Sequence, residues 1–304
     1  MTTLDDRPRI EDPNEHPNSA PPLGGPLSRR NLWATITGGY LPLLLATAVV
    51  ILPMAWMVVS SFKAPDQLVT QNIVLLPRTL APRNYLEAAR TVPFPRLFLN
   101  SAIVTVLGAG LKVVLAVLTA YALVFIRFPA KRWIFGAILV TLMVPPQVSL
   151  LPNYLLITGL GGADTYWGII LPGLGTGFGT FLLRQHFLSV PASILEAAEI
   201  DGAGHWKRLT RIVLPISMPA IATVALVSIV FEWNDYLWPL VIVTNPHMMT
   251  LPVGLTLLSN SESGAASYGI LMAGTVLVIV PVLIVFAALQ RYVVAGLTQG
   301  AVKD

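Results

Sequence analysis

The chain has 304 residues, of which 55% are hydrophobic and 11% are charged, and its formal net charge is +4. A mean hydropathy of +0.71 excludes an ordinary soluble domain, because too few polar groups remain to cover its surface. The lack of cysteine excludes a disulfide framework and a thiolate metal site. The basic residues stand mostly between apolar runs, which favours membrane topology over nucleic-acid binding.

Residues 1–36 differ from the rest of the chain. They are rich in proline and charge and poor in apolar residues, a composition that favours a disordered tail. The tail lacks the basic start of a signal peptide, and the first apolar run comes late and is long. We therefore expect that run to remain as a membrane helix and residues 37–304 to form a transmembrane domain.

Six apolar runs follow the tail, and each is long enough to cross a bilayer as a helix, which takes about 20 residues. Helices are favoured because irregular backbone facing lipid would leave peptide groups without hydrogen bonds. At Pro145–Pro146, in the third run, a hinge and a plain bend are equally compatible with the sequence. The sequence predicts an all-α integral membrane protein with six spans, at about 40–62, 97–126, 133–157, 167–187, 219–243 and 269–290.

Lysine and arginine gather in alternate loops, and their distribution predicts the orientation. Basic residues are present in 127–132 and 184–214 and absent from 158–166 and 244–268. The first two loops are therefore predicted to be cytoplasmic, and with six spans both termini, including the tail, are cytoplasmic too. The loop 63–96 disagrees because it also holds basic residues, but the side assigned to the cytoplasm carries more of them.

The polar stretch EAAEIDGAGHWKRLTRIVLP begins at Glu196 in the longest predicted cytoplasmic connection, 191–215. Ser193 is predicted to cap a short helix whose first turn holds Glu196. Gly202 readily takes a positive φ, so we expect it to end this helix together with Asp201. A second short helix follows. Judged by residue chemistry alone, a solvated amphipathic connector explains the stretch as well as a functional surface does.

The spacing within this stretch resembles that of permease subunits in ABC importers. The pattern EAA-x3-G-x9-I-x-L-P is matched at every fixed position from Glu196 to Pro215. Its place between the fourth and fifth predicted spans resembles the carbohydrate-importer branch. The resemblance implies a pair of coupling helices that sits in a cleft of a separate ATPase subunit. The residues implied in this coupling are Glu196, Ala197, Ala198, Asp201 and Gly202.

Further segments extend the resemblance over about residues 40–304. WNDYLWPL (233–240) is similar to a family segment that usually has Glu or Gln where this chain has Asp235, and the ending QRYVVAGLTQGAVKD is similar to the family's C-terminal tail. Three stretches resemble permeases for glycerol 3-phosphate and its diesters more than maltose-type permeases: 110–129, 141–148 and 179–187.

The resemblance implies a type I importer permease fold in a bacterial inner membrane. The implied partners are lipid, a homologous second permease subunit, an ATPase dimer that uses ATP and magnesium, and an extracytoplasmic binding protein. Neither nucleic acid nor a cofactor of the chain's own is expected, and the chain is not expected to be an enzyme. The implied solute is glycerol 3-phosphate or a glycerophosphodiester, with a sugar or oligosaccharide as the alternative. A gradient-driven carrier is less favoured because of the coupling pattern.

Three charged residues fall near the centres of predicted spans, where a charge costs at least about 2.5–3.5 kcal/mol on insertion scales. Lys112 lies near the centre of the second span, and Glu232 and Asp235 lie three residues apart, hence on one helical face, in the fifth. Lys112 either pairs structurally with Glu232, or attracts an anionic solute, or extends its stem to water. The predicted substrate pathway also includes Trp233, Asn234 and Tyr236.

The run GLGTGFG (173–179) does not fit a dinucleotide fingerprint, because Phe178 stands where the third glycine is required. The pairs Gly173/Gly177 and Gly175/Gly179 have small-xxx-small spacing, which predicts close helix packing. No P-loop sequence is present, and the four histidines have no metal or catalytic spacing. We therefore predict neither a catalytic nor a metal site in this chain.

Overall fold

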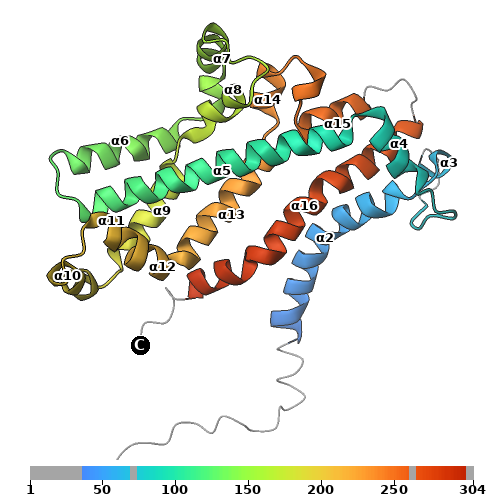
Figure 1. The fold of residues 1–304 in the computed structure, drawn as a ribbon. Coiled ribbons are helices and arrows are strands. Elements are labelled where there is room, and N and C mark those ends of the chain that lie inside the picture. The colour runs from blue at the N-terminus through green and yellow to red at the C-terminus, as the bar shows by residue number, and fades with distance from the viewer. Residues whose placement is uncertain (1–35, 69–73, 260–264, 299–304) are drawn as a thin grey trace, which may run out of the picture. The chain divides into compact units, whose positions relative to one another are not determined.

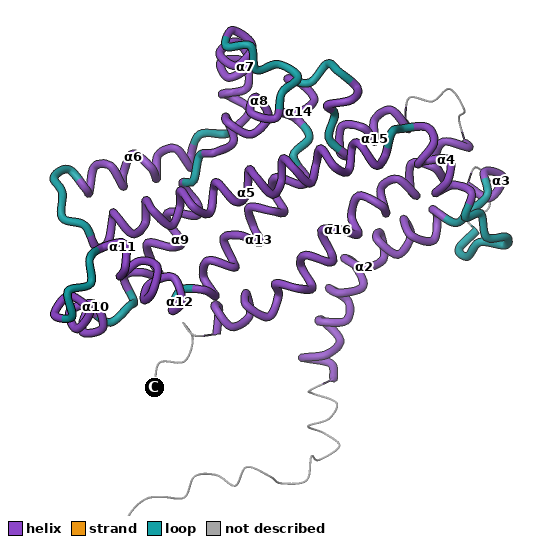
Figure 2. The backbone as a smooth tube through the Cα atoms, in the orientation of Figure 1, coloured by secondary structure: helices purple, strands orange, loops and turns teal. Residues whose placement is uncertain are grey.

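The computed structural model describes residues 36–68, 74–259 and 265–298. Within these ranges the backbone forms helices and loops and no strand (Figure 2). The prediction of an all-α protein is therefore confirmed for the described residues. The predicted disordered tail lies outside them, except for residue 36.

The chain divides into two compact units, 1–55 and 56–304. The first unit holds η1 (Ile36–Tyr40) and most of α2 (Leu41–Ser61). Together these elements cover the first predicted span. The second unit contains every other described element.

The second unit is built around α5 (Phe94–Phe125), whose 32 residues extend for about 48 Å at 1.5 Å per residue. Figure 1 shows α5 alongside α9 (Gly177–Leu188) and α13 (Met218–Asn234), and α13 packs in turn against α16 (Ala265–Thr298). Close approach of these helices depends on a small residue. A Cβ atom added at Gly179 would lie 3.0 Å from both Ala116 Cβ on α5 and Val224 Cγ1 on α13.

Three helices of the described residues are each long and apolar enough to cross a bilayer: Gly38–Ser61, Phe94–Phe125 and Tyr268–Arg291. The number reaches six if each of three bent helix pairs forms one span. The bent pairs are Lys131–Met143 with Pro146–Gly159 (92°), Tyr166–Leu174 with Gly177–Leu188 (48°), and His205–Ile216 with Met218–Asn234 (81°). The first, second and sixth predicted spans are thus continuous helices, whereas the third and fourth are broken.

The third span breaks at two consecutive prolines. After α6 (Lys131–Met143), Val144 and Pro145 are both extended, and η2 (Pro146–Ser149) and α7 (Leu150–Gly159) continue at 92° to α6. A proline ring pushes the preceding residue out of the helical region, which applies here to Val144 and then to Pro145. The predicted kink is therefore present, as a change of direction of 92°.

The glycine run of the fourth span is divided between two elements, so the members of each predicted glycine pair do not lie on one helix. Gly173 belongs to η3 (Leu171–Leu174), and Gly175 lies in the connection before α9. Close packing is nevertheless observed at two of the four glycines. A Cβ at Gly177 would lie 2.7 Å from Leu142 Cδ2, and Gly179 packs against α5 and α13 as described above, whereas a Cβ at Gly175 would meet open space.

Loops at one end of the second unit are tied together by polar side chains. Asp164 accepts hydrogen bonds from the backbone N–H groups of Thr244 and Asn245 at 2.8 and 2.7 Å and from the Thr244 hydroxyl at 2.7 Å. These hydrogen bonds, that from the Asn245 N–H first, hold the pKa of the Asp164 carboxyl below its ordinary value. The Tyr166 hydroxyl donates to Asn100 Oδ1 on α5 at 2.8 Å.

The remaining described elements are short. They are α3 (Pro65–Leu68), α4 (Arg83–Thr91), α8 (Tyr166–Ile170), α10 (Ala192–Ile200), α11 (His205–Arg208), η4 (Leu209–Val213), α12 (Leu214–Ile216), α14 (Leu237–Ile242), η5 (Pro246–Met248) and α15 (Leu251–Ser259).

Candidate functional site

A cavity of about 880 Å³ opens within the second unit; we call it the bundle cavity. Its walls come from α5, the broken third and fourth spans, and the end of α13. Thr141 and Ser149 contribute hydroxyl groups, and Phe231 contributes an exposed ring. Four of the six predicted pathway residues line it: Lys112, Glu232, Asn234 and Asp235.

The charged groups of the bundle cavity are paired across two helices. Lys112 Nζ on α5 forms an ion pair with Glu232 Oε1 on α13, and their side chains are 19% and 9% exposed. Gly108, one turn before Lys112, leaves room for the carboxylate, since a Cβ there would lie 2.8 Å from Glu232 Oε2. The pair satisfies two charges that would each be costly alone in an apolar bundle. Lys112 therefore offers no uncompensated positive charge to the cavity.

Asp235 lines the cavity, but it does not lie on the helical face that was predicted for it. α13 ends at Asn234, and Asp235 has extended backbone angles (φ −65°, ψ 121°), so Glu232 and Asp235 do not share a helical face. Pro239 supplies a reason, because in a continuous helix its ring would clash with the carbonyl of Asp235, four residues earlier. The break turns the Asp235 side chain toward the same cavity that Glu232 lines.

Trp233 and Tyr236 do not line the bundle cavity. Trp233 is 6% exposed, and its Nε1 donates to the Val278 carbonyl of α16 at 2.9 Å. Its ring meets that of Phe98 edge-on, with centroids 5.7 Å apart. Trp233 therefore joins α13 to α16 and α5. Tyr236 is 39% exposed and stays a prediction as a pathway residue.

The polar stretch forms two short helical segments with a tight turn between them; we call α10 and the continuous run α11–η4–α12 the helix pair. The turn has Gly202 at φ +70°, and the Gly202 N–H donates to the Glu199 carbonyl at 3.0 Å. The predicted break at Asp201–Gly202 is thus confirmed. The predicted Ser193 cap is wrong: α10 begins at Ala192, and Pro191 precedes it without a side-chain cap. A proline before the helix fixes φ near the value its start requires, and the Ile194 N–H donates to the Pro191 carbonyl at 3.3 Å in place of a hydroxyl.

The helix pair leaves most of its predicted coupling residues open to solvent. Glu196, Ala197, Asp201 and Gly202 are exposed, whereas Ala198 is buried. Large apolar side chains are exposed beside them, since Ile200 is 87% and Trp206 is 70% exposed. Exposed apolar groups rimmed by polar ones are typical of a protein-binding surface.

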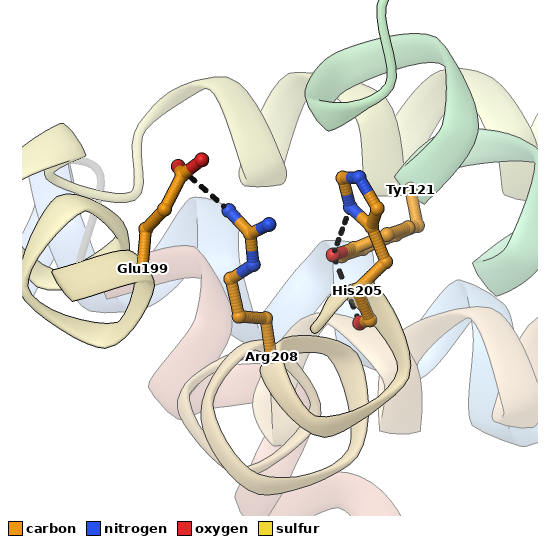
Figure 3. A network of polar contacts seen from close by, with 4 residues as sticks. All are labelled: Tyr121, Glu199, His205 and Arg208. Atoms are coloured by element: carbon orange, nitrogen blue, oxygen red, sulfur yellow. Dashed lines mark hydrogen bonds and ion pairs between the residues drawn. The ribbon is translucent and has the colours of Figure 1, made fainter. Parts of the chain in front are cut away.

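A polar network fastens the helix pair together and to the bundle (Figure 3). Arg208 Nη1 and Glu199 Oε2 are 3.0 Å apart across the turn. On α5, the Tyr121 hydroxyl donates to the His205 carbonyl at 3.0 Å and lies 3.3 Å from His205 Nδ1. Sequence reasoning did not identify Tyr121. The available signal was a tyrosine inside an apolar span, whose hydroxyl needs a partner.

The described residues contain no group of three or more His, Cys, Asp or Glu that could hold a metal ion. The bundle cavity can form hydrogen bonds through hydroxyl, amide and carboxylate groups. It also has one ammonium group, which is paired. The helix pair offers an exposed surface and a direct chain connection to α13 through Ser217.

Known proteins resemble this chain over most of its length. It is 35% identical over 268 residues to the sn-glycerol-3-phosphate transport system permease protein UgpE of Brucella suis biovar 1 (strain 1330), covering 86% of this chain and 95% of that protein. It is 32% identical to the arabinooligosaccharides transport system permease protein AraQ of Halalkalibacterium halodurans, covering 84% of this chain and 92% of that protein.

A solved structure shows the same fold. It is a crystal structure of a bacterial ABC transporter involved in the import of the acidic polysaccharide alginate; one of its chains matches with a TM-score of 0.77 and 26% identity, covering 89% of this chain and all of that one. The model of one protein family matches residues 112–299. This match includes Lys112, the whole helix pair and the bundle cavity's α13 wall. The chain therefore belongs to the family of binding-protein-dependent transport system inner membrane components, the permease subunits of ABC importers.

Proposed function

We propose that this permease works as one of two homologous membrane subunits and is driven by a separate ATPase dimer that binds ATP and magnesium. An extracytoplasmic binding protein delivers the solute, as the family's description implies. The chain itself hydrolyses no ATP. Both termini and the helix pair face the cytoplasm, in keeping with the lysine and arginine of 127–132 and 184–214.

The observation that carries this proposal is the exposed surface of the helix pair. Glu196 and Asp201 stand in solvent next to the apolar Ile200 and Trp206, which suits a docked protein better than a solvated connector. The second segment of the pair continues into α13. A force applied by the ATPase at the pair therefore reaches the wall of the bundle cavity through the chain itself.

We propose glycerol 3-phosphate or a glycerophosphodiester as the solute. The support is the similarity to permeases named for sn-glycerol-3-phosphate, which extends over 95% of their length. Lys112 is the cation available in the cavity wall, and a phosphate group would have to share or displace Glu232 to reach it. The remaining lining groups, hydroxyls and carboxylates, suit the hydroxyl groups of a glycerol moiety.

An oligosaccharide is the second candidate, and the same lining gives it specific support. Carboxylates and amides hydrogen-bond sugar hydroxyls, and the exposed Phe231 ring offers an apolar face to a sugar ring. The similarity to an arabinooligosaccharide permease supports it as well.

The test uses the complete transporter reconstituted in proteoliposomes with its binding protein. Radiolabelled glycerol 3-phosphate and an arabino-oligosaccharide are offered in parallel, and we expect ATP-dependent uptake of the first. The coupling role is tested with Glu196→Lys and Gly202→Pro, which we expect to lower solute-stimulated ATPase activity and uptake at least about tenfold while the subunit stays in the membrane. Asp66→Lys on α3, an exposed acid outside the helix pair, is the matched control. Normal stimulated ATPase activity in both helix-pair variants would contradict the coupling role.

A further inference from the structure

We infer that Tyr121 is a positioning residue of the transport cycle: its hydroxyl fastens the helix pair to α5, so that a movement of the pair is passed to the helix that carries Lys112. The inference rests on the proposed function, because an ATPase must move the pair. It assigns a role to a side chain that touches neither the solute cavity nor the exposed coupling surface.

The contact is half-buried and directional. Tyr121 is 4% exposed, and its hydroxyl donates to the His205 carbonyl at 3.0 Å, at the first residue of α11 (Figure 3). The Tyr121 ring meets the His205 ring edge-on with centroids 6.1 Å apart. Around it, Leu209 and Val213 of η4 share one buried cluster with Tyr121. A phenol hydroxyl in such a site loses its hydration and is held by one protein partner.

The helix pair can move as one body. The Arg208–Glu199 contact at 3.0 Å closes the turn from one side, and the Ala203 N–H donates to the Ala198 carbonyl at 2.9 Å within it. A force on α10 is therefore carried into α11 across the turn.

The two helices that bear the ion pair are attached to this body in different ways. α13 is its direct continuation in the chain, through the 81° bend at Ser217. α5 has no such continuation, because α6 to α9 separate it from the helix pair in sequence. Noncovalent contacts must therefore carry motion to α5, and the Tyr121–His205 hydrogen bond is a polar contact among them. Lys112 lies nine residues earlier on α5, about 13.5 Å along the helix axis.

The attachment of α5 to the helix pair affects the ion pair in the bundle cavity. Lys112 on α5 and Glu232 on α13 stay paired only while the two helices move in step. Tyr121 couples α5 to the same body that drives α13. Without the hydroxyl, α13 follows the ATPase and α5 lags, so that ATP is hydrolysed with less solute moved.

Three variants isolate this contact. Tyr121→Phe keeps the ring and the buried cluster and removes the hydroxyl. Tyr166→Phe is the matched control, because it removes a tyrosine hydroxyl that bonds Asn100 near the other end of α5. His205→Ala removes the imidazole but keeps the backbone carbonyl that accepts the 3.0 Å hydrogen bond, so we expect it to be milder than Tyr121→Phe.

The first measurement is glycerol 3-phosphate taken up per ATP hydrolysed, in proteoliposomes. We expect Tyr121→Phe to lower this ratio about two- to tenfold, the range that the loss of one hydrogen bond corresponds to, with ATP hydrolysis itself retained. A purely stabilising hydroxyl would lower the amount of folded complex and leave the ratio unchanged. A wild-type ratio in Tyr121→Phe, or an equal loss in Tyr166→Phe, would overturn the inference.

The second measurement needs ATP but no transported solute. The chain lacks cysteine, so spin labels can be placed at Leu118 on α5 and Arg211 on η4, both exposed, in a complex whose partners also lack reactive cysteines. In the wild type we expect one narrow distance distribution with and without ATP and vanadate; in Tyr121→Phe the distribution broadens with ATP. Identical distributions would overturn the inference.

A wild-type transporter that imports neither solute contradicts the proposed function instead, and the distance measurement then still decides the role of Tyr121.

Discussion

The bundle cavity and the helix pair differ in the surroundings of their charged groups: an ion pair lies in the cavity, and exposed acids lie on the helix pair. Inside the bundle, Lys112 and Glu232 satisfy each other, with side chains 19% and 9% exposed. In the helix pair, Glu196 and Asp201 have solvent around them, and the large apolar Ile200 and Trp206 are exposed as well. An apolar surrounding makes an unpaired charge costly, whereas a surface in water can hold both kinds of group ready for a partner. Changes in the bundle cavity should therefore affect the stability of the fold. Changes in the helix pair should affect its association with a partner protein.

The largest effect is expected from breaking the buried pair. Lys112→Met leaves the Glu232 carboxylate without its cation in an apolar bundle, and this should lower the free energy of unfolding by about 3–5 kcal/mol. The double variant Lys112→Met/Glu232→Gln should recover most of that loss, because no unpaired charge remains. Thermal unfolding of the purified complex measures both variants.

Uptake by the double variant then separates the two roles of Lys112. A stable double variant that transports normally makes the pair structural, and a stable one that does not transport places the pair in the solute pathway. Equal stability of Lys112→Met and wild type would contradict the comparison between the two regions.

A smaller effect is expected in the turn of the helix pair. Gly202 and Gly204 both have open space where a Cβ would be, but Gly202 has φ +70° and Gly204 has φ −65°. Gly202→Ala should cost about 1–2 kcal/mol from the left-handed conformation alone, while Gly204→Ala should be close to neutral. Hydrogen exchange of the amides in 197–205 should accelerate about five- to thirtyfold in the first variant.

Packing in the turn gives no reason for the two alanine variants to differ. Similar exchange rates in both would therefore mean that the left-handed turn is not maintained in solution. Global thermal stability should change little in either variant, because the turn lies at the surface.

The smallest effect is expected at Asp164, in a loop outside the membrane-spanning segments. Its pKa is held below the ordinary value by three hydrogen bonds to the anion. The carboxylate therefore contributes stability above its unfolded pKa, about 3.9, and this contribution is lost as pH falls through the lower folded pKa. Asp164→Asn, which tolerates the φ of +55°, should lower Tm by no more than about 2 °C at pH 7.

The pH dependence provides the check on that variant. The Tm difference between wild type and Asp164→Asn should hold from pH 7 to about 5 and shrink below about 4. A Tm difference that grows as the pH falls would contradict the prediction that the ionised form of Asp164 stabilises the protein.

Prediction from sequence succeeded where a local rule dominates. Runs of about 20 apolar residues gave the first, second and sixth spans, because a bilayer demands length and internal hydrogen bonds. Gly202 gave the turn, because few other residues adopt its backbone angles readily. The ion pair of Lys112 with Glu232 was one of several alternatives, and it is present in the structure. Two opposite charges on helices that pack together in an apolar bundle have few other partners.

Prediction was incomplete or wrong where two local rules compete over several residues. At Pro145–Pro146 the sequence predicted a kink, with a hinge and a plain bend both open, and only the structure gives its size, 92°. Asp235 left its helix because of Pro239, four residues away, although the spacing to Glu232 suggested one face. Trp233, grouped with the pathway residues by position, donates instead to the Val278 carbonyl.

The sequence by itself determined the class of protein, the apolar segments and the location of the polar helix pair, since these depend on composition and on the spacing of neighbouring residues. The tertiary structure alone decided which residues meet across helices. Lys112 and Glu232 are 120 positions apart in the chain, and Tyr121 and His205 are 84 apart. Such contacts depend on how α5, α9 and α13 pack, and packing is set by the volumes and shapes of many side chains at once, which no short motif records.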